Sequence, residues 1–153
     1  MRILVLEDED VKLEQLTQVI VDRLPGCDVQ TARSLNSGLR CLEATAFDLL
    51  ILDMSVPSFD VTESDDGGAP QAFAGFELVR FLRWKRNSAR VIVFTQFDRF
   101  GSGDDSITLD ELTDRIRGEL GEKYVGSVFY DAAAVEWQRA LSGLLDDMNI
   151  SET

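Results

Sequence analysis

The sequence predicts a parallel α/β sheet that is covered by helices on both faces. Short apolar runs alternate with longer amphipathic segments along the chain, which is the pattern of parallel strands joined by crossover helices. Five such strand–helix units account for all 153 residues, and 44% of the residues are hydrophobic. That length and composition suit one globular domain with its own core. We therefore predict a single domain over residues 1–153.

The first three strands are predicted at residues 2–6, 28–32 and 48–52. The helix after the first strand carries apolar residues at helical spacing and is ended by Pro25-Gly26. The helix after the second strand has Ser34 or Asn36 as its candidate N-cap. The inward positions of these two helices are Leu13, Leu16, Ile20, Leu24, Leu35, Leu39 and Leu42.

The last two strands are predicted at residues 90–94 and 124–130. A helix after Gly75 precedes the first of them, and a helix that begins at Thr108 precedes the second. Glu111 follows Thr108 at the spacing of a capping box. A closing helix is expected over 133–148, and we expect Trp84 and Trp137 to pack against the sheet. The inward positions of the helix after Gly75 and of the closing helix are Phe76, Val79, Leu82, Val135, Leu141, Leu144 and Leu145, with Phe81 as a further candidate.

Two segments interrupt this rhythm and are predicted as inserted loops, at about 58–74 and 96–107. The first has several acidic residues and Gly67-Gly68, and the second has Gly101 and Gly103. Their acidic side chains do not match the spacing of an EF-hand, so a solvated loop is favoured over a Ca²⁺ site. Phe97 and Phe100 in the second loop either pack on the core or face a partner.

Composition excludes several classes of function. The net charge is −13, so direct binding to a nucleic-acid backbone is not expected. The chain has no histidine, which removes Ser-His and Cys-His nucleophiles and histidine metal ligands. Cys27 and Cys41 form no CxxC motif and are expected to be buried thiols. No apolar run approaches the roughly 20 residues needed to span a membrane, and we expect a cytoplasmic protein that makes no membrane contact.

Acidic side chains follow two of the predicted strands. Glu7 and Asp8 come directly after the first strand, and Asp53 comes after the third. If these strands are neighbours, the three carboxylates converge at one edge of the sheet, which is costly unless a cation joins them. Oxygen ligands of this kind suit Mg²⁺, and a carboxylate beside bound Mg²⁺ is a plausible phosphoryl acceptor.

These motifs resemble those of receiver domains of two-component response regulators. The resemblance rests on three stretches, Ile3-Leu4-Val5-Leu6-Glu7-Asp8-Glu9, Phe47 to Pro57 with Asp53 at the end of its strand, and Val91-Ile92-Val93-Phe94-Thr95. The order of the five units fits as well, so the resemblance covers nearly the whole chain. It implies a flavodoxin-like doubly wound sheet of five parallel strands in the order 2-1-3-4-5.

The resemblance also implies roles for particular residues. Asp53 would accept the phosphoryl group, and Thr95 would hydrogen-bond the phosphoryl oxygens and move inward on activation. Glu7, Asp8, Asp53 and the backbone carbonyl of Ser55 would ligate Mg²⁺ or Mn²⁺. A haloacid-dehalogenase phosphatase also uses an aspartate after a strand, but it needs a second carboxylate two residues later, where this chain has Ser55.

The chain departs from the receiver pattern at the fifth strand. Receivers carry a lysine at the end of that strand which pairs with the phosphoryl group, whereas no lysine follows Lys123 here. Lys123 precedes the strand and is expected at the wrong end of it. A loop cation such as Arg99 is one candidate substitute. The family also has a glycine a few residues after the proline, whereas Pro57 and Gly75 enclose the first insertion.

The expected function is that of a stand-alone receiver, a signalling switch and not an enzyme beyond Mg-dependent self-phosphorylation and autodephosphorylation. A histidine kinase or phosphotransfer protein would donate to Asp53, and the change would bias the face formed by the fifth strand and the last two helices. Output would pass to a partner protein or a homodimer. The alternative is a pseudo-receiver that acts as a phosphorylation-independent interaction module, which the missing lysine and the insertions favour.

Overall fold

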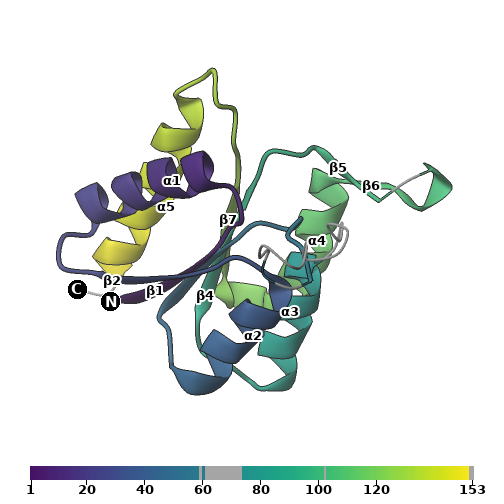
Figure 1. Ribbon diagram of the computed structural model, residues 1–153, viewed down its shortest axis with the longest axis horizontal. Helices are drawn as coiled ribbons and strands as arrows, with labels where there is room; N and C mark the ends of the chain where they lie inside the picture. The colour runs from purple at the N-terminus through teal and green to yellow at the C-terminus, as the bar shows by residue number, and fades with distance from the viewer. Residues whose placement is uncertain (59, 61–73, 102, 152–153) are drawn as a thin grey trace.

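The computed structural model describes residues 1–58, 60, 74–101 and 103–151. Its centre is a parallel sheet of five strands in the order β2-β1-β3-β4-β7 (Figure 1). This is the predicted 2-1-3-4-5 order, because β7 is the fifth strand of the main sheet. In the described part of the chain, no helix is long and apolar enough to cross a membrane. The strands are β1 (Arg2–Leu6), β2 (Asp28–Ala32), β3 (Leu49–Leu52), β4 (Arg90–Thr95) and β7 (Tyr124–Phe129).

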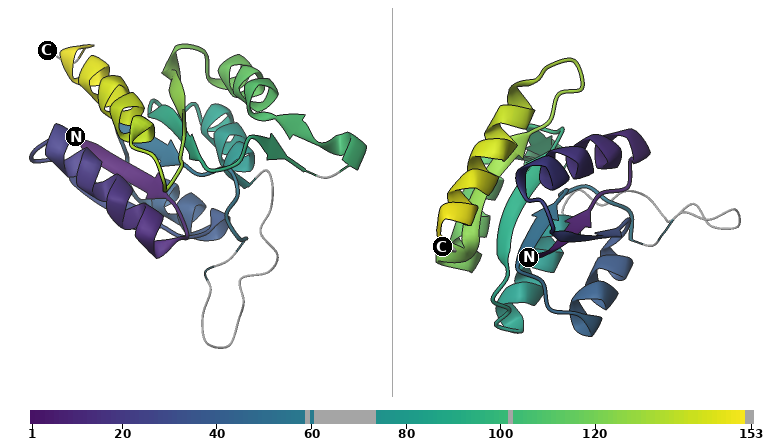
Figure 2. Two further views of the ribbon diagram at one scale, coloured as in Figure 1. Left: turned by 90° about the horizontal axis from the view of Figure 1, so that it is seen from above. Right: turned by 90° about the vertical axis from the view of Figure 1, so that its left-hand side faces the viewer.

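In the part of the chain that the structure describes, five α-helices cover the two faces of the sheet (Figures 1 and 2). On one face α1 (Asp10–Arg23) lies beside α5 (Glu136–Ser151), and on the other lie α2 (Leu35–Ala44), α3 (Ala74–Trp84) and α4 (Leu109–Leu120). Alternate residues of each strand point to opposite faces. In β1, Ile3 and Val5 therefore join the core under α1 and α5, while Leu4 and Leu6 join the core on the other face.

Two predicted helix starts are confirmed. Ser34 caps α2, because its hydroxyl accepts a hydrogen bond from the Ser37 amide at 3.1 Å. Thr108 caps α4 in the same way, with the Glu111 amide as donor at 3.1 Å. Each cap satisfies a backbone donor that the first helical turn leaves free, so these helices begin where the sequence placed them.

The closing helix was predicted to begin too early. It begins at Glu136, since Asp131 organises a turn in which its side chain accepts from the Ala133 amide at 2.9 Å. Val135 precedes the helix and is 56% exposed, so it is not an inward residue. Trp137 is buried as expected. The expectation for Trp84 was wrong, since it ends α3 and is 75% exposed, with Lys85 over its ring.

The second insertion is not simply a loop. It forms a two-stranded antiparallel ribbon from β5 (Arg99–Phe100) and β6 (Ile107–Thr108), with the short 3₁₀ helix η1 (Gly103–Asp105) at its tip (Figure 1). Phe100 pairs with Ile107, and both are buried, which gives the ribbon an apolar anchor. Phe100 therefore packs on the core, whereas Phe97 is 43% exposed. A second 3₁₀ helix, η2 (Gly121–Lys123), leads into β7.

Most of the first insertion, residues 61–73, lies outside the described residues. Its described beginning is tied to the body of the protein. Asp60 accepts a hydrogen bond from the hydroxyl of Ser34 at 2.6 Å, and this bond lowers the pKa of Asp60. The N-cap of α2 is therefore also the anchor of the insertion.

Candidate functional site

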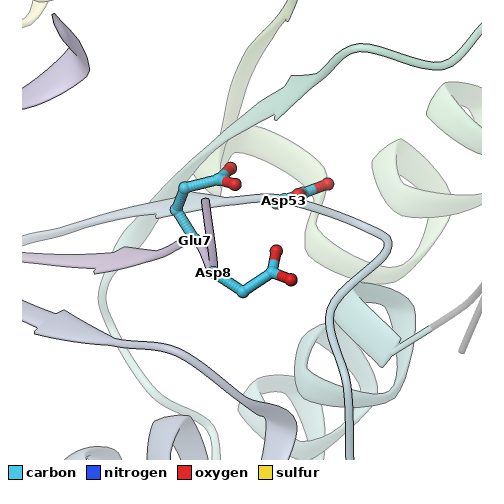
Figure 3. Close-up of side chains that lie close together, drawn as sticks. All are labelled: Glu7, Asp8 and Asp53. Atoms are coloured by element: carbon cyan, nitrogen blue, oxygen red, sulfur yellow. The ribbon is translucent and has the colours of Figure 1, made fainter. Parts of the chain in front are cut away.

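The carboxyl ends of β1 and β3 bring three carboxylates together, as predicted. Leu6 and Leu52 are register partners, and the Asp53 amide donates to the Leu6 carbonyl at 2.9 Å. The residues that follow the two strands are therefore side by side. Oxygen atoms of Glu7, Asp8 and Asp53 lie within 4.8 Å of one another (Figure 3).

The three carboxylates are held in an environment that disfavours their charge. Glu7 is fully buried, Asp53 is 3% exposed and Asp8 is partly exposed. Burial and the neighbouring Asp53 raise the pKa of Glu7 to about 8. Burial and Asp53 also raise the pKa of Asp8, and burial raises the pKa of Asp53 even though Lys12 opposes the shift. Such a cluster favours a cation that would relieve the repulsion.

One cation is already present, and sequence analysis did not anticipate it. Lys12 lies in the first turn of α1 and is only 1% exposed. Its Nζ is 2.8 Å from Glu7 Oε2 and 3.2 Å from Asp53 Oδ2. Burial alone would lower the pKa of Lys12, but Asp53 and Glu7 outweigh it and raise that pKa. The sequence did contain a signal for this position. Lys12 lies four residues before Leu16 and eight before Ile20, which places it on the same buried face of α1.

Asp53 opens onto a hollow of about 330 Å³ at this edge of the sheet. Its Oδ1 accepts a hydrogen bond from the Ser55 amide at 3.1 Å, while its Oδ2 faces Lys12. The lining includes Asp8, Asp53, Ser55, Gln96, Phe97 and Arg99. The acceptor candidate and two predicted metal ligands therefore border one space, whereas Glu7 faces Lys12 behind it.

Thr95 lies at the same edge of the sheet, as the last residue of β4. It is fully buried, and its hydroxyl accepts a hydrogen bond from the Phe97 amide at 3.2 Å. Among the hydrogen bonds of the described residues, none joins this hydroxyl to Asp53. Its role toward a phosphoryl group remains a prediction.

The donor set fits a divalent cation. If all three carboxylates were ionised, the cluster with the Lys12 ammonium would carry a net charge of −2, which one Mg²⁺ would balance. All the candidate ligands are oxygens, as Mg²⁺ prefers. Glu7 Oε2 also has no hydrogen-bond partner of suitable geometry in the described structure, despite its ion pair with Lys12. Asp8 and Asp53 border the hollow and are the ligands we expect to be direct.

The fold is similar to that of response-regulator receiver domains of known structure. The response regulatory domain of protein mrkE from Klebsiella pneumoniae superposes with a TM-score of 0.66 at 14% identity, covering 99% of this chain and 97% of that one. The response regulator TrrA from Thermotoga maritima, solved in complex with Mg²⁺-BeF, gives a TM-score of 0.59 at 21% identity, with 94% and 97% covered. The fold that the sequence predicted is thereby confirmed.

Curated relatives match along nearly their whole length. The chain is 29% identical over 142 residues to the uncharacterized protein y4jR of Sinorhizobium fredii, covering 92% of this chain and 94% of the relative. It is 23% identical over 143 residues to the Detocs response regulatory protein DtcB of Enterobacter cloacae, with 92% and 95% covered. No protein-family model matches the chain.

Proposed function

We propose that this protein is a response-regulator receiver that accepts a phosphoryl group on Asp53 in the presence of Mg²⁺. The observation that carries the proposal is the convergence of Asp8 and Asp53 on one hollow, with Glu7 behind them. The likeness to a Detocs response regulatory protein supports the same class of function. The protein would act as a signalling switch and not as an enzyme on a separate substrate.

In the proposed reaction a carboxylate oxygen of Asp53 attacks the phosphorus atom of the donor. The P–O or P–N bond of the donor breaks, and the leaving group keeps the electron pair. Bound Mg²⁺ would supply charge neutralisation for the transferred group. Asp8 and Asp53 would hold the metal directly, with the Ser55 carbonyl as a further ligand and Glu7 acting directly or through a water, while Thr95 would bind a phosphoryl oxygen.

The donor must be another molecule, because the chain has no histidine of its own to phosphorylate. A histidine kinase or phosphotransfer protein would fill that role. The output surface that we propose lies beside Thr95, where Phe97 and Phe129 are 43% and 48% exposed. Both line a second hollow with Tyr130 and Asp131. A movement of Thr95 would therefore change the shape of a surface that an output partner or a second copy could contact.

The proposal is tested by intact mass after incubation with Mg²⁺ and acetyl phosphate. The wild-type protein should gain one phosphoryl group, and the gain should disappear with EDTA and in Asp53→Asn. Asp48→Asn is a matched control, because Asp48 is exposed and precedes β3 at the far end of the strand. Phosphorylation of Asp53→Asn to the wild-type extent would refute Asp53 as the acceptor.

A second candidate is a pseudo-receiver that serves as a phosphorylation-independent interaction module. Lys12 favours it, because this internal cation already neutralises part of the carboxylate charge. The two candidates differ in whether the site still binds Mg²⁺.

Mg²⁺ binding is expected to change the fluorescence of Trp137. This side chain packs at steep ring angles against Tyr130 and Phe94, the two rings that contact Lys12, with ring centroids 5.2 and 5.5 Å away. In Trp84→Phe it is the remaining tryptophan of two, so a titration reports on the site alone. A saturable change that is lost in Asp8→Asn supports the receiver. No change in fluorescence and no rise in melting temperature at a large excess of Mg²⁺ would favour the pseudo-receiver, because a ligand that binds the folded state must stabilise it.

A further inference from the structure

We propose that Lys12, supplied by α1, is the cation that pairs with the phosphoryl group on Asp53, in place of a lysine at the end of the fifth strand. This inference rests on the proposed phosphorylation of Asp53. The positive charge that binds the phosphoryl group would then come from α1, the helix after β1, and not from the end of β7. Three observations carry it.

The first observation is that the end of β7 offers no cation. Tyr130 and Asp131 follow the strand directly. Lys123 precedes β7, and its Nζ donates to the Asn87 carbonyl at 2.7 Å. It lines a hollow with Ser88 and Arg90, at the start of β4. Because the strands are parallel, Lys123 lies at their amino-terminal ends, whereas Asp53 lies at their carboxyl-terminal ends.

The second observation is the position of the Lys12 ammonium. It is within hydrogen-bonding distance of Asp53 Oδ2, at 3.2 Å, and is buried there. A group transferred to Asp53 would place its oxygens within a few ångströms of this charge. The negative charge then moves from the carboxylate to the phosphoryl oxygens, and Lys12 would follow it through a charge-assisted hydrogen bond. Glu7 holds the ammonium from the other side at 2.8 Å.

The third observation is an aromatic cage that positions the lysine. Its Nζ is 5.4 Å from the centre of the Phe94 ring and 5.6 Å from that of Tyr130, distances at which a ring face attracts a cation. Tyr130 is the first residue after β7, where the receiver pattern places lysine. A ring at the strand end therefore supports a cation that comes from α1.

Arg99 is the competing cation, since it lines the same hollow. Its side chain is exposed, and its Nη2 donates to the Ser106 hydroxyl across the β5–β6 ribbon at 3.2 Å. Lys12 has direct contact with Asp53 and is shielded from water, where an ion pair is screened less than at an exposed position. The geometry therefore favours Lys12.

The test compares Lys12→Met with Arg99→Met and with Lys85→Met, which removes an exposed lysine beside Trp84. The measurements are the rate of phosphorylation by acetyl phosphate and the affinity for beryllofluoride in the presence of Mg²⁺, followed by Trp137 fluorescence. Lys12→Met should lower the rate about 10²-fold, the loss typical of removing one group that stabilises developing charge. It should weaken beryllofluoride binding at least tenfold more than it weakens Mg²⁺ binding, and Lys85→Met should behave as wild type.

A lysine with a merely structural role would lower the melting temperature without this selective loss of beryllofluoride affinity. Wild-type rates in Lys12→Met, or a larger loss in Arg99→Met, would overturn the assignment and leave the proposed function standing. A wild-type protein that accepts no phosphoryl group and binds no beryllofluoride would overturn both.

A second measurement does not depend on the folding of Lys12→Met. The chain has three lysines, so Lys85→Arg combined with Lys123→Arg leaves Lys12 alone. In protein labelled with ¹⁵N at the lysine Nζ, the Lys12 ammonium should give a slowly exchanging signal, because it is buried. That signal should shift when beryllofluoride is added with Mg²⁺. An unchanged signal at saturating beryllofluoride would refute contact between Lys12 and the phosphoryl position.

Discussion

Replacing Gly75 with alanine is expected to destabilise the protein by about 3 kcal/mol, at the upper end of the cost of overpacking a core. Gly75 lies in the first turn of α3, and its amide donates to the Met54 carbonyl at 3.2 Å. A methyl group there would lie 2.8 Å from the Asp53 carbonyl oxygen and 2.9 Å from Met54 Cα. Both are backbone atoms, so a change of rotamer cannot relieve the clash.

The expected displacement falls on the backbone of the proposed phosphoryl acceptor. Gly75→Ala should therefore weaken Mg²⁺ binding as well as lower the free energy of unfolding. Gly118→Ala is the matched control, since Gly118 lies exposed in α4 with nothing within 4 Å of an added Cβ. That change should raise stability by up to about 1 kcal/mol through helix propensity. Denaturant unfolding of both variants tests this, and equal effects would contradict it.

Gly75 also shows how the first insertion is compatible with a receiver site. The resemblance predicted a glycine a few residues after the proline, and here the insertion separates Pro57 from Gly75. In the structure Gly75 nevertheless packs directly on Asp53 and Met54. The glycine that packs behind Asp53 therefore comes from the chain that follows the insertion.

The sheet and the carboxylate cluster were predictable because each depends on local pattern. Apolar runs mark the strands, and a side chain that follows a strand must lie at the edge of the sheet. Ser34 and Thr108 were predictable as caps for the same reason, since their signal lies within one helical turn.

Lys12 was not predicted because its role depends on tertiary structure. A lysine at an inward position of a helix is ordinarily unfavourable. It is stable there only because the folded chain places two carboxylates and two aromatic rings around it, those of Glu7, Asp53, Phe94 and Tyr130. The β5–β6 ribbon escaped prediction for a related reason. Its strands have two residues each, too few for a periodic pattern, and it depends on the burial of Phe100.

The metal-free protein is expected to lose stability as the pH rises from about 4.5 to about 8. Glu7 has its pKa raised to about 8 by burial and by Asp53, against an ordinary value of 4.5. In that window the folded protein keeps a proton that the unfolded chain has released, so raising the pH favours unfolding. The slope for one proton is at most about 1.4 kcal/mol per pH unit. Saturating Mg²⁺ should reduce it, because the positive charge of a bound metal favours the ionised form of Glu7.

Glu7→Gln should remove most of this slope while keeping the shape of the side chain. At pH 8 in EDTA the variant should be more stable than wild type by on the order of 2 kcal/mol, less than the pKa shift alone implies, because the lost attraction to Lys12 offsets part of the gain. Glu14→Gln is the control, since Glu14 is exposed on α1. Urea unfolding at pH 6 and pH 8 measures the difference. A slope as steep in Glu7→Gln as in wild type would mean that Asp53 or Asp8 holds the proton. The proton that Mg²⁺ binding must displace would then lie on a carboxyl group that borders the hollow, and not on Glu7 behind it.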